Sequence, residues 1–153
     1  MPPDLKPDEL LALARQVLDI ESRAVDQLKS RLDGCFAAAC SLCLATSGRI
    51  VVTGMGKSGH IGRKIGATLA STGTPSFFVH PAEASHGDLG MITSSDLLLA
   101  VSYSGETEEI VTILPLIKRM GAKLIPLPAS LDRRWRRQPT PTSTSAWMKK
   151  PAH

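Results

Sequence analysis

A loop rich in hydroxyl groups lies where an apolar run gives way to a helical pattern. Ser102, Ser104 and Thr107 surround Gly105, directly after the apolar run at residues 96–101. Three side-chain O–H groups and the free backbone N–H groups of a helix start could converge there on one phosphate group. The helix dipole would add a favourable field for the anion. The sequence therefore predicts a phosphate-binding loop, in preference to a merely solvated loop of Ser and Gly.

A second glycine-rich loop, Gly-Met-Gly-Lys-Ser-Gly at residues 54–59, follows another short apolar run. Its G-x-G-x-x-G spacing matches the dinucleotide fingerprint, but a His-Pro pair stands where the acidic residue of that fingerprint would follow the next strand. A nucleotide P-loop is also disfavoured, because its upstream glycine would fall at Val51. What remains is a turn in which Gly56 allows close approach of the backbone, Ser58 is a donor and Lys57 supplies a charge.

Three further polar residues are open to more than one interpretation. His86, in the loop at residues 81–90, could line a polar site, bind a metal or belong only to the loop. It has no HxH or HxxxE partner, so the evidence for a metal is poor. Glu108 and Glu109 fall in the first turn of a predicted helix, where acidic residues usually interact with the helix dipole. One of them could instead point into the site and carry a proton.

Alternating strands and helices must position these loops. The hydrophobic pattern predicts short buried strands at residues 50–53, 76–80, 96–101 and 123–127. Helices are expected at about residues 59–71 and 107–120. This alternation predicts a three-layer α/β fold with a parallel sheet, in which ligands bind beyond the carboxyl ends of the strands. Both glycine-rich loops fall at that edge.

A helical arm is expected ahead of this core. Apolar residues recur at helical spacing from about Asp8 to Arg31, and a second, more apolar helix extends to about Ala45. Cys40 and Cys43 are three residues apart on the second helix. We expect both to be buried small side chains rather than a redox or metal pair. The arm is expected to pack on a neighbouring subunit or to cover its own sheet.

Composition and charge favour one cytoplasmic α/β protein. The chain has 153 residues, of which 42% are hydrophobic and 21% charged, as in ordinary globular proteins. Its start lacks a basic region followed by an apolar run, and no stretch is apolar enough to span a bilayer, so we expect no membrane partner. Residues 128–153 hold six Lys and Arg against one Asp, which accounts for the chain's net charge of +4. The rest has no basic stripe with interleaved aromatics, and we expect no nucleic-acid partner.

Four segments in succession closely resemble the sugar isomerase (SIS) domain superfamily, and within it the bacterial arabinose-5-phosphate isomerases. They are residues 52–64, 72–81, 84–91 and 104–106. The resemblance covers about residues 8–127 and implies a SIS-type, flavodoxin-like sheet. It also implies a phosphosugar substrate, with D-arabinose 5-phosphate and D-ribulose 5-phosphate interconverting on the route to the Kdo sugar of lipopolysaccharide. By the same resemblance the protein would be a homotetramer, and the reaction requires no cofactor.

The resemblance also implies roles for individual residues. The phosphate would be held by hydroxyl groups of the two loops, those of Ser58, Ser102, Ser104 and Thr107, beside the turn at Gly56. Lys57, His86 and Glu109 match positions that line the family's active site. Isomerisation shifts a proton between adjacent carbons through an enediol, which needs a base and donors that stabilise the oxyanion. Lys57 would be the stabiliser, and either Glu109 or His86 could move the proton.

The resemblance ends within the chain. The family's SIS domain continues with a fifth strand, further helices and an additional glutamate and histidine, and many members then have a pair of CBS domains; none of these is found in this sequence. We therefore divide the chain into a helical arm (1–46), a partial SIS core (47–127) and a disordered basic tail (128–153). The abrupt change to Arg, Pro, Thr, Ser and Trp favours a tail translated out of frame. A native basic tail that binds an acidic partner is the competing hypothesis.

A partial core has physical consequences. We expect an incomplete sheet with an unpaired edge, marginal stability and poor or absent isomerase activity. A non-catalytic phosphosugar-binding module and a non-functional fragment are the alternative functions.

Overall fold

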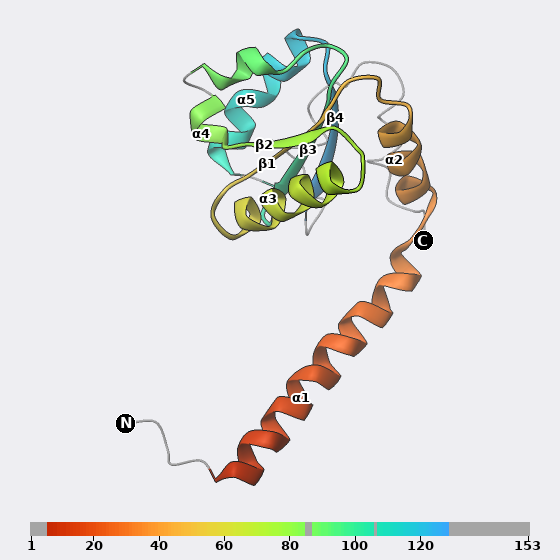
Figure 1. The fold of residues 1–153 in the computed structure, drawn as a ribbon, viewed down its shortest axis with the longest axis vertical. Helices are drawn as coiled ribbons and strands as arrows, with labels where there is room; N and C mark the ends of the chain where they lie inside the picture. The colour runs from red at the N-terminus through yellow and green to blue at the C-terminus, as the bar shows by residue number, and fades with distance from the viewer. Residues whose placement is uncertain (1–5, 85–86, 106, 129–153) are drawn as a thin grey trace. The chain divides into compact units, whose positions relative to one another are not determined.

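The computed structural model describes residues 6–84, 87–105 and 107–128 (Figure 1). The chain divides into two compact units, Met1–Ala38 and Ala39–His153. Of the predicted tail only Pro128 falls within the described residues, and His86 falls outside them. No helix in the described ranges has both the length and the apolar character needed to cross a membrane.

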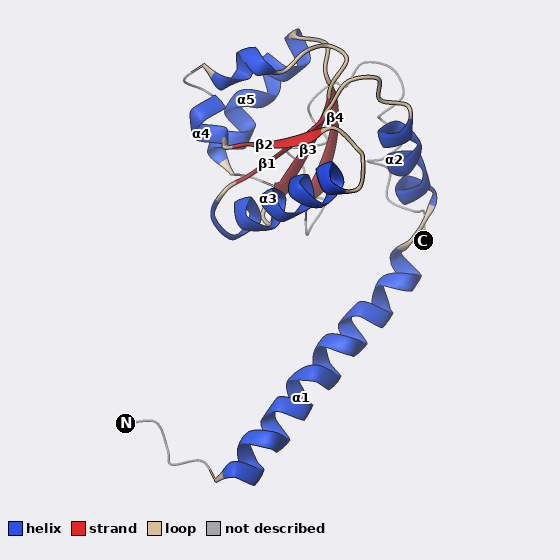
Figure 2. Ribbon diagram, in the orientation of Figure 1, coloured by secondary structure: helices blue, strands red, loops and turns tan. Residues whose placement is uncertain are grey.

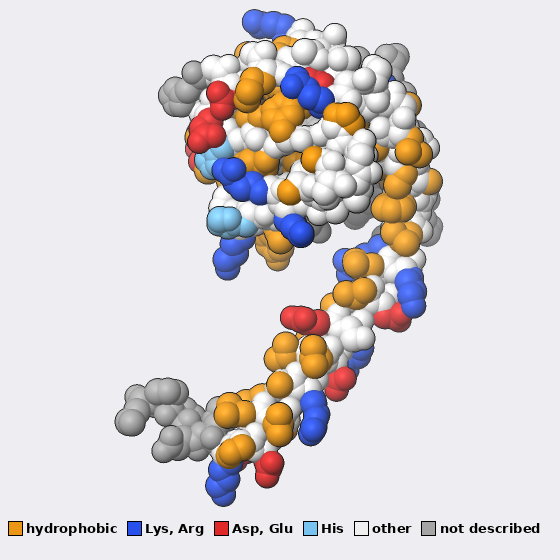
Figure 3. Space-filling view, viewed as in Figure 1, with side chains coloured by type: hydrophobic (Ala, Val, Ile, Leu, Met, Phe, Trp, Pro, Cys, Tyr) orange, Lys and Arg blue, Asp and Glu red, His pale blue; other side chains and the backbone are white. Residues whose placement is uncertain are grey.

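The first unit is mainly one long helix, α1 (Pro7–Asp26), followed by a 3₁₀ turn, η1 (Gln27–Arg31). Pro7 stands at the first helical position, and Asp8 and Glu9 place negative charge at the positive end of the helix dipole. The predicted arm helix is therefore present, with a 3₁₀ last turn. None of its residues is buried, and hydrophobic side chains run along the length of α1 (Figure 3).

Four parallel strands form the sheet of the second unit, in the order β2-β1-β3-β4 (Figure 1 and Figure 2). They are β1 (Ile50–Gly54), β2 (Ser76–Val79), β3 (Leu97–Ser102) and β4 (Lys123–Pro128). In the register of the sheet, Val51 lies opposite Phe77 on one side and Leu98 on the other. The predicted parallel sheet is confirmed, and its order matches the first four strands of a flavodoxin-like fold.

Helices cover both faces of this sheet, as the predicted three-layer fold requires (Figure 2). The elements outside the sheet are α2 (Gly34–Leu44), α3 (Gly56–Ser71), α4 (Pro81–Ala84), η2 (Asp88–Met91) and α5 (Glu108–Arg119). α3 and residues 39–43 of α2 pack on one face, and α5 packs on the other. The stretch predicted to be a polar loop contains α4 and η2, because elements of four residues are too short to show a helical period.

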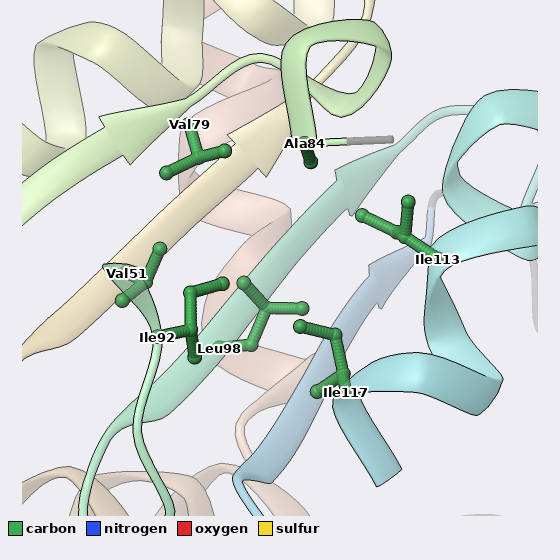
Figure 4. Packing of buried hydrophobic residues seen from close by; sticks show 7 residues of the cluster. All are labelled: Val51, Val79, Ala84, Ile92, Leu98, Ile113 and Ile117. Atoms are coloured by element: carbon green, nitrogen blue, oxygen red, sulfur yellow. The ribbon is translucent and has the colours of Figure 1, made fainter. Parts of the chain in front are cut away.

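Aliphatic side chains fill the layers on both sides of the sheet. On the α5 side, Val51 and Leu98 from adjacent strands meet Ile113 and Ile117 of α5, with Ile92 beside them (Figure 4). On the α3 side, the buried members of the second cluster are Ile50, Val52, Leu97, Leu99 and Ile125. Strands β1 and β3 thus contribute side chains to both layers, which explains their uninterrupted apolar sequences.

The expectation that both cysteines of α2 are buried is wrong for Cys40. Ala39, Leu42 and Cys43 pack against the sheet, whereas Cys40 is exposed. Successive helical residues are 100° apart, so Cys40 projects beyond the arc that faces the sheet. Burial, together with the nearby Cys40, raises the pKa of the half-buried Cys43 thiol. Cys43 therefore packs as a small apolar side chain.

A buried carboxylate joins the amino ends of the central strands. Asp96 is 2% exposed and accepts hydrogen bonds from the amides of Arg49 at 2.7 Å and Thr93 at 2.8 Å. It also accepts from Thr93 Oγ1 at 3.0 Å and from Arg49 Nη2 at 3.3 Å. The Arg49 guanidinium lies over the Phe77 ring, 4.7 Å from its centroid. Asp96 thus links β1, β3 and, through Arg49, the edge strand β2.

β4 is an edge strand with few donors on its outer side. Lys123 N donates to Asp96 O at 3.3 Å, so the peptide groups of alternate residues counted from Lys123 face β3. Pro126 and Pro128 fall at positions that face away from β3, and proline has no N–H group. The predicted unpaired edge is present among the described residues, but it is poorly suited to pairing with another strand.

Candidate functional site

The polar loops of the second unit meet at a topological switch point. β1 lies between β2 and β3. After β1 the chain forms β2 on one side of it and then crosses to form β3 on the other side. The turn between β1 and α3 and the loop between β3 and α5 therefore begin at adjacent carboxyl ends. In open α/β sheets ligands bind at such points. The candidate site lies here.

Gly54 packs the two loops against one another. A Cβ atom on Gly54 would stand 2.9 Å from the carbonyl oxygen of Ser58 and 3.0 Å from that of Val101. Both oxygens are backbone atoms, so the β1–α3 turn lies directly on the end of β3. Ser58 is thereby placed beside Val101 and the loop that follows it.

Helix α3 begins just after β1, and its N-cap residue provides no side-chain cap for the first N–H groups. Its N-cap residue, Met55, makes no side-chain hydrogen bond to the helix, and the Met55 carbonyl accepts from Gly59 N at 3.1 Å. Gly56 has a φ of +52°, which L side chains rarely adopt. The amides of Gly56, Lys57 and Ser58 have no acceptor within the helix. The positive end of the α3 dipole therefore faces the site.

The loop between β3 and α5 is organised around the buried hydroxyl of Ser102. Ser102 Oγ accepts a hydrogen bond from Gly105 N at 3.0 Å and lies 2.9 Å from Thr107 Oγ1. Thr107 is the N-cap residue of α5, yet its hydroxyl makes no capping bond. The amides of Glu108 and Glu109 therefore begin α5 without a side-chain acceptor from the N-cap residue. A second helix N-terminus is thus available to an anion.

The structure places the predicted phosphate-binding residues at one edge of the sheet. Gly56 and Ser58 lie in the first turn of α3, while Ser102, Ser104 and Thr107 lie at or just after the end of β3. They differ in burial: Ser102 is buried, Ser58 and Thr107 are half-buried, and Ser104 is exposed.

The predicted catalytic residues are less tightly grouped. Lys57 is exposed in the first turn of α3, and His86 lies outside the described residues. Glu109 is exposed at the start of α5. A cavity of about 240 Å³ between α4 and α5 is lined by Ala82, Glu108, Glu109 and Thr112. No group of three or more His, Cys, Asp or Glu residues within the described ranges is arranged to hold a metal ion.

Two residues with structural roles, Gly54 at the site and Asp96 at the opposite, amino ends of the strands, are not singled out by the sequence patterns. Gly54 is visible only as the first glycine of the G-x-G spacing, and Asp96 only as the first residue of a predicted strand. The role of Gly54 could have been predicted from its position, because a glycine at the end of a β-strand often marks a place where another backbone segment approaches closely. For Asp96 the signal is an acidic residue directly before a fully apolar run.

Comparisons with known proteins agree with this geometry. A family model described as "SIS domain" matches residues 43–145. The chain is 65% identical over 112 residues to the arabinose 5-phosphate isomerase KdsD of Pseudomonas aeruginosa, an alignment that covers 73% of this chain and 34% of that protein. It is 53% identical over 117 residues to the arabinose 5-phosphate isomerase KpsF of Escherichia coli, covering 76% of this chain and 36% of that protein.

A solved structure shows the same fold. An Escherichia coli CFT073 protein in complex with arabinose 5-phosphate superposes with a TM-score of 0.77 at 43% identity, covering 82% of this chain and 67% of that chain. The chain spans about a third of the length of the curated relatives it matches.

Proposed function

Because the chain belongs to the SIS domain family, we propose that it is the phosphosugar-binding part of an arabinose-5-phosphate isomerase. The proposal rests on one observation. Two helix N-termini, neither capped by its N-cap side chain, begin at the carboxyl ends of the adjacent parallel strands β1 and β3. Their N–H groups and the positive ends of two dipoles favour a phosphate dianion at that edge. The relatives named as arabinose 5-phosphate isomerases supply the choice of sugar.

The residues divide into a phosphate-binding group and a reacting group. In our proposal Ser58, Ser104 and the first amides of α3 and α5 hold the phosphate. Lys57, on the first turn of α3, stabilises negative charge on the sugar oxygens as it develops. Glu109, on the first turn of α5, is the base that we favour among the described residues, since it lines the cavity beside α4.

The proposed reaction moves two protons and requires no external oxidant or reductant. A base removes the proton from C2 of D-arabinose 5-phosphate, and the carbonyl oxygen at C1 gains a proton, which gives the enediol. The O2 hydroxyl then loses its proton as C1 gains one, which gives D-ribulose 5-phosphate. Such phosphorylated sugars do not cross lipid bilayers unaided, so we place the reaction in the cytoplasm.

Ser58→Ala is expected to weaken the binding of arabinose 5-phosphate by the full chain by about tenfold, the usual effect of losing a hydrogen bond to a charged group. Isothermal titration calorimetry would measure the dissociation constant. Ser71→Ala is the matched control: Ser71 is exposed at the far end of the same helix, and this change should leave the dissociation constant as it is. Equal affinities of the wild type and Ser58→Ala would contradict the proposed role of Ser58.

Three functional classes are separated by combining binding with turnover. Binding together with ribulose 5-phosphate formation supports an isomerase, whereas binding without turnover supports a phosphosugar-binding module. Absence of both supports a non-functional fragment. We expect binding with weak or no turnover, because the 153-residue chain spans about a third of the length of its isomerase relatives.

We also propose that α1 mediates self-association. Leu10, Leu13, Val17 and Ile20 recur at helical spacing and are exposed, and an apolar stripe of this kind normally packs against a partner. Val17→Asp should shift the protein toward monomers in sedimentation velocity. Ala12→Asp, on the polar side of α1, is the control and should leave the sedimentation coefficient unchanged. A wild-type protein that is already monomeric at micromolar concentration would refute the proposal.

A further inference from the structure

Two cysteine side chains of helix α2 lie about one turn apart and differ in exposure. Cys40 is exposed, whereas Cys43 is half-buried and packs against the sheet. Residues three apart on a helix are neighbours on its surface, with about 5–6 Å between their Cβ atoms. Burial raises the pKa of the Cys43 thiol, and the charge of the nearby Cys40 raises it further. The two thiols are therefore close enough to act on one another.

The helical spacing disfavours a direct disulfide bond between these two residues. A disulfide needs Cβ atoms about 3.5–4.5 Å apart, which is closer than neighbouring turns of a helix provide. Forming one would distort the carboxyl end of α2, where Leu42 and Cys43 pack on the sheet. A metal ion bridges a wider gap, since two metal–sulfur bonds of about 2.3 Å join sulfur atoms up to about 4.6 Å apart. The spacing thus favours a shared ion over a sulfur–sulfur bond.

The number of available ligands restricts which ion the pair can hold. Within the described part of the chain, no group of three or more His, Cys, Asp or Glu residues is placed to bind a metal. Two thiolates do not complete the four-coordinate shell of a structural zinc ion. Thiolate sulfur is a soft ligand that selects soft ions, Cu(I) among them. Because Cu(I) is stable with only two sulfur ligands, it suits this pair better than zinc does.

We propose that Cys40 and Cys43 form a dithiolate site for Cu(I) on helix α2. On binding, two copper–sulfur bonds form, the two thiol protons pass to solvent, and no electron is transferred. The exposed Cys40 is the point of entry, and Cys43 completes the site by turning its sulfur atom toward the ion. The sequence expectation differs, because it treats both cysteines as buried small side chains. Neither residue belongs to the candidate functional site, so this inference is independent of the proposed function.

Titration of the reduced full chain with Cu(I), in anaerobic buffer that contains a competing Cu(I) chelator, tests the inference. We expect the wild type to bind one Cu(I) per chain. Cys40→Ser and Cys43→Ser should each lower the affinity about a hundredfold, because two ligands fixed on one helix reinforce each other's binding. Cys35→Ser is the matched control: Cys35 precedes Cys40 by five residues, which is not one helical turn, and the affinity should stay unchanged.

Alkylation with iodoacetamide, followed by fragmentation mass spectrometry, identifies the ligands without any substitution. In the absence of copper, the exposed Cys40 should be alkylated faster than Cys43. One equivalent of Cu(I) should protect both thiols and leave the alkylation of Cys35 as it was. Equal Cu(I) affinities of the wild type and Cys40→Ser, a wild type that binds no Cu(I), or protection of Cys40 without Cys43 would each overturn the inference. Cys40→Ser changes an exposed position, and its circular dichroism spectrum should match that of the wild type.

Discussion

Gly54→Ala is expected to abolish measurable binding of arabinose 5-phosphate and to lower the free energy of unfolding by about 3 kcal/mol. The added methyl group would stand 2.9 Å from the Ser58 carbonyl oxygen and 3.0 Å from the Val101 carbonyl oxygen. Neither backbone atom can rotate away, so the β1–α3 turn must separate from the end of β3. Separation moves the two helix N-termini apart, and the phosphate loses half of its donors. Calorimetric titration and urea unfolding would measure the two effects.

Gly90→Ala is the matched control for this substitution. Gly90 lies in η2, its φ is not positive, and a Cβ atom placed there meets no other atom within 4 Å. It should retain wild-type affinity and change the free energy of unfolding by less than about 0.5 kcal/mol. If Gly54→Ala binds the sugar phosphate as well as Gly90→Ala does, contact between the two loops is not required for binding.

Asp96→Ala should lower the free energy of unfolding by about 3 kcal/mol, a large part of the roughly 5–15 kcal/mol of an ordinary domain. It leaves the buried amides of Arg49 and Thr93 without the acceptor that they share. It also removes the carboxylate beside the Arg49 guanidinium. Urea unfolding followed by circular dichroism would measure the loss. Asp19→Ala, at an exposed position on α1, is the control and should change the value by less than about 0.5 kcal/mol.

The stabilising effect of Asp96 should depend on pH in a defined direction. Burial alone would raise the pKa of the Asp96 carboxyl, but hydrogen bonds from Arg49 and Thr93 lower it overall. The unfolded chain therefore takes up this proton at a higher pH than the folded chain. The stabilisation is fully present above the ordinary aspartate pKa of about 3.9, and it is lost as the pH falls through the lower folded value. The stability difference between the wild type and Asp96→Asn should accordingly narrow below about pH 4.

The strands of this protein and their parallel arrangement are largely readable from its sequence. Residues 50–52 and 97–101 are apolar without alternation, which indicates strands buried on both faces, and the structure places β1 and β3 at the centre of the sheet. Because every strand is parallel, the loop after each one must fall at the same edge. The position of both glycine-rich loops follows from that rule alone.

Local propensity is a poorer guide to the ends of the elements. The sequence places the start of α3 at Gly59, since glycines at 54 and 56 favour a turn. The helix instead begins at Gly56, because Gly54 lets the turn pack directly against Ser58 and β3. The prediction that Cys40 is buried is wrong for a related reason. Its spacing from Cys43 indicates a shared helical face, but it does not show which part of that face meets the sheet.

The identity of the strands, the loops that share the carboxyl edge and the hydroxyl-bearing side chains there all follow from the order of the amino acids. Tertiary packing was needed to establish that Ser102 is enclosed and bonded to Gly105 and Thr107, and that Gly54 joins the Ser58 turn to the end of β3. Hydrophobic periodicity reports which side of an element is buried, because burial depends on the average polarity of a face. It does not report which polar atoms bond to one another, because those distances depend on how the strands and the loops that follow them pack together.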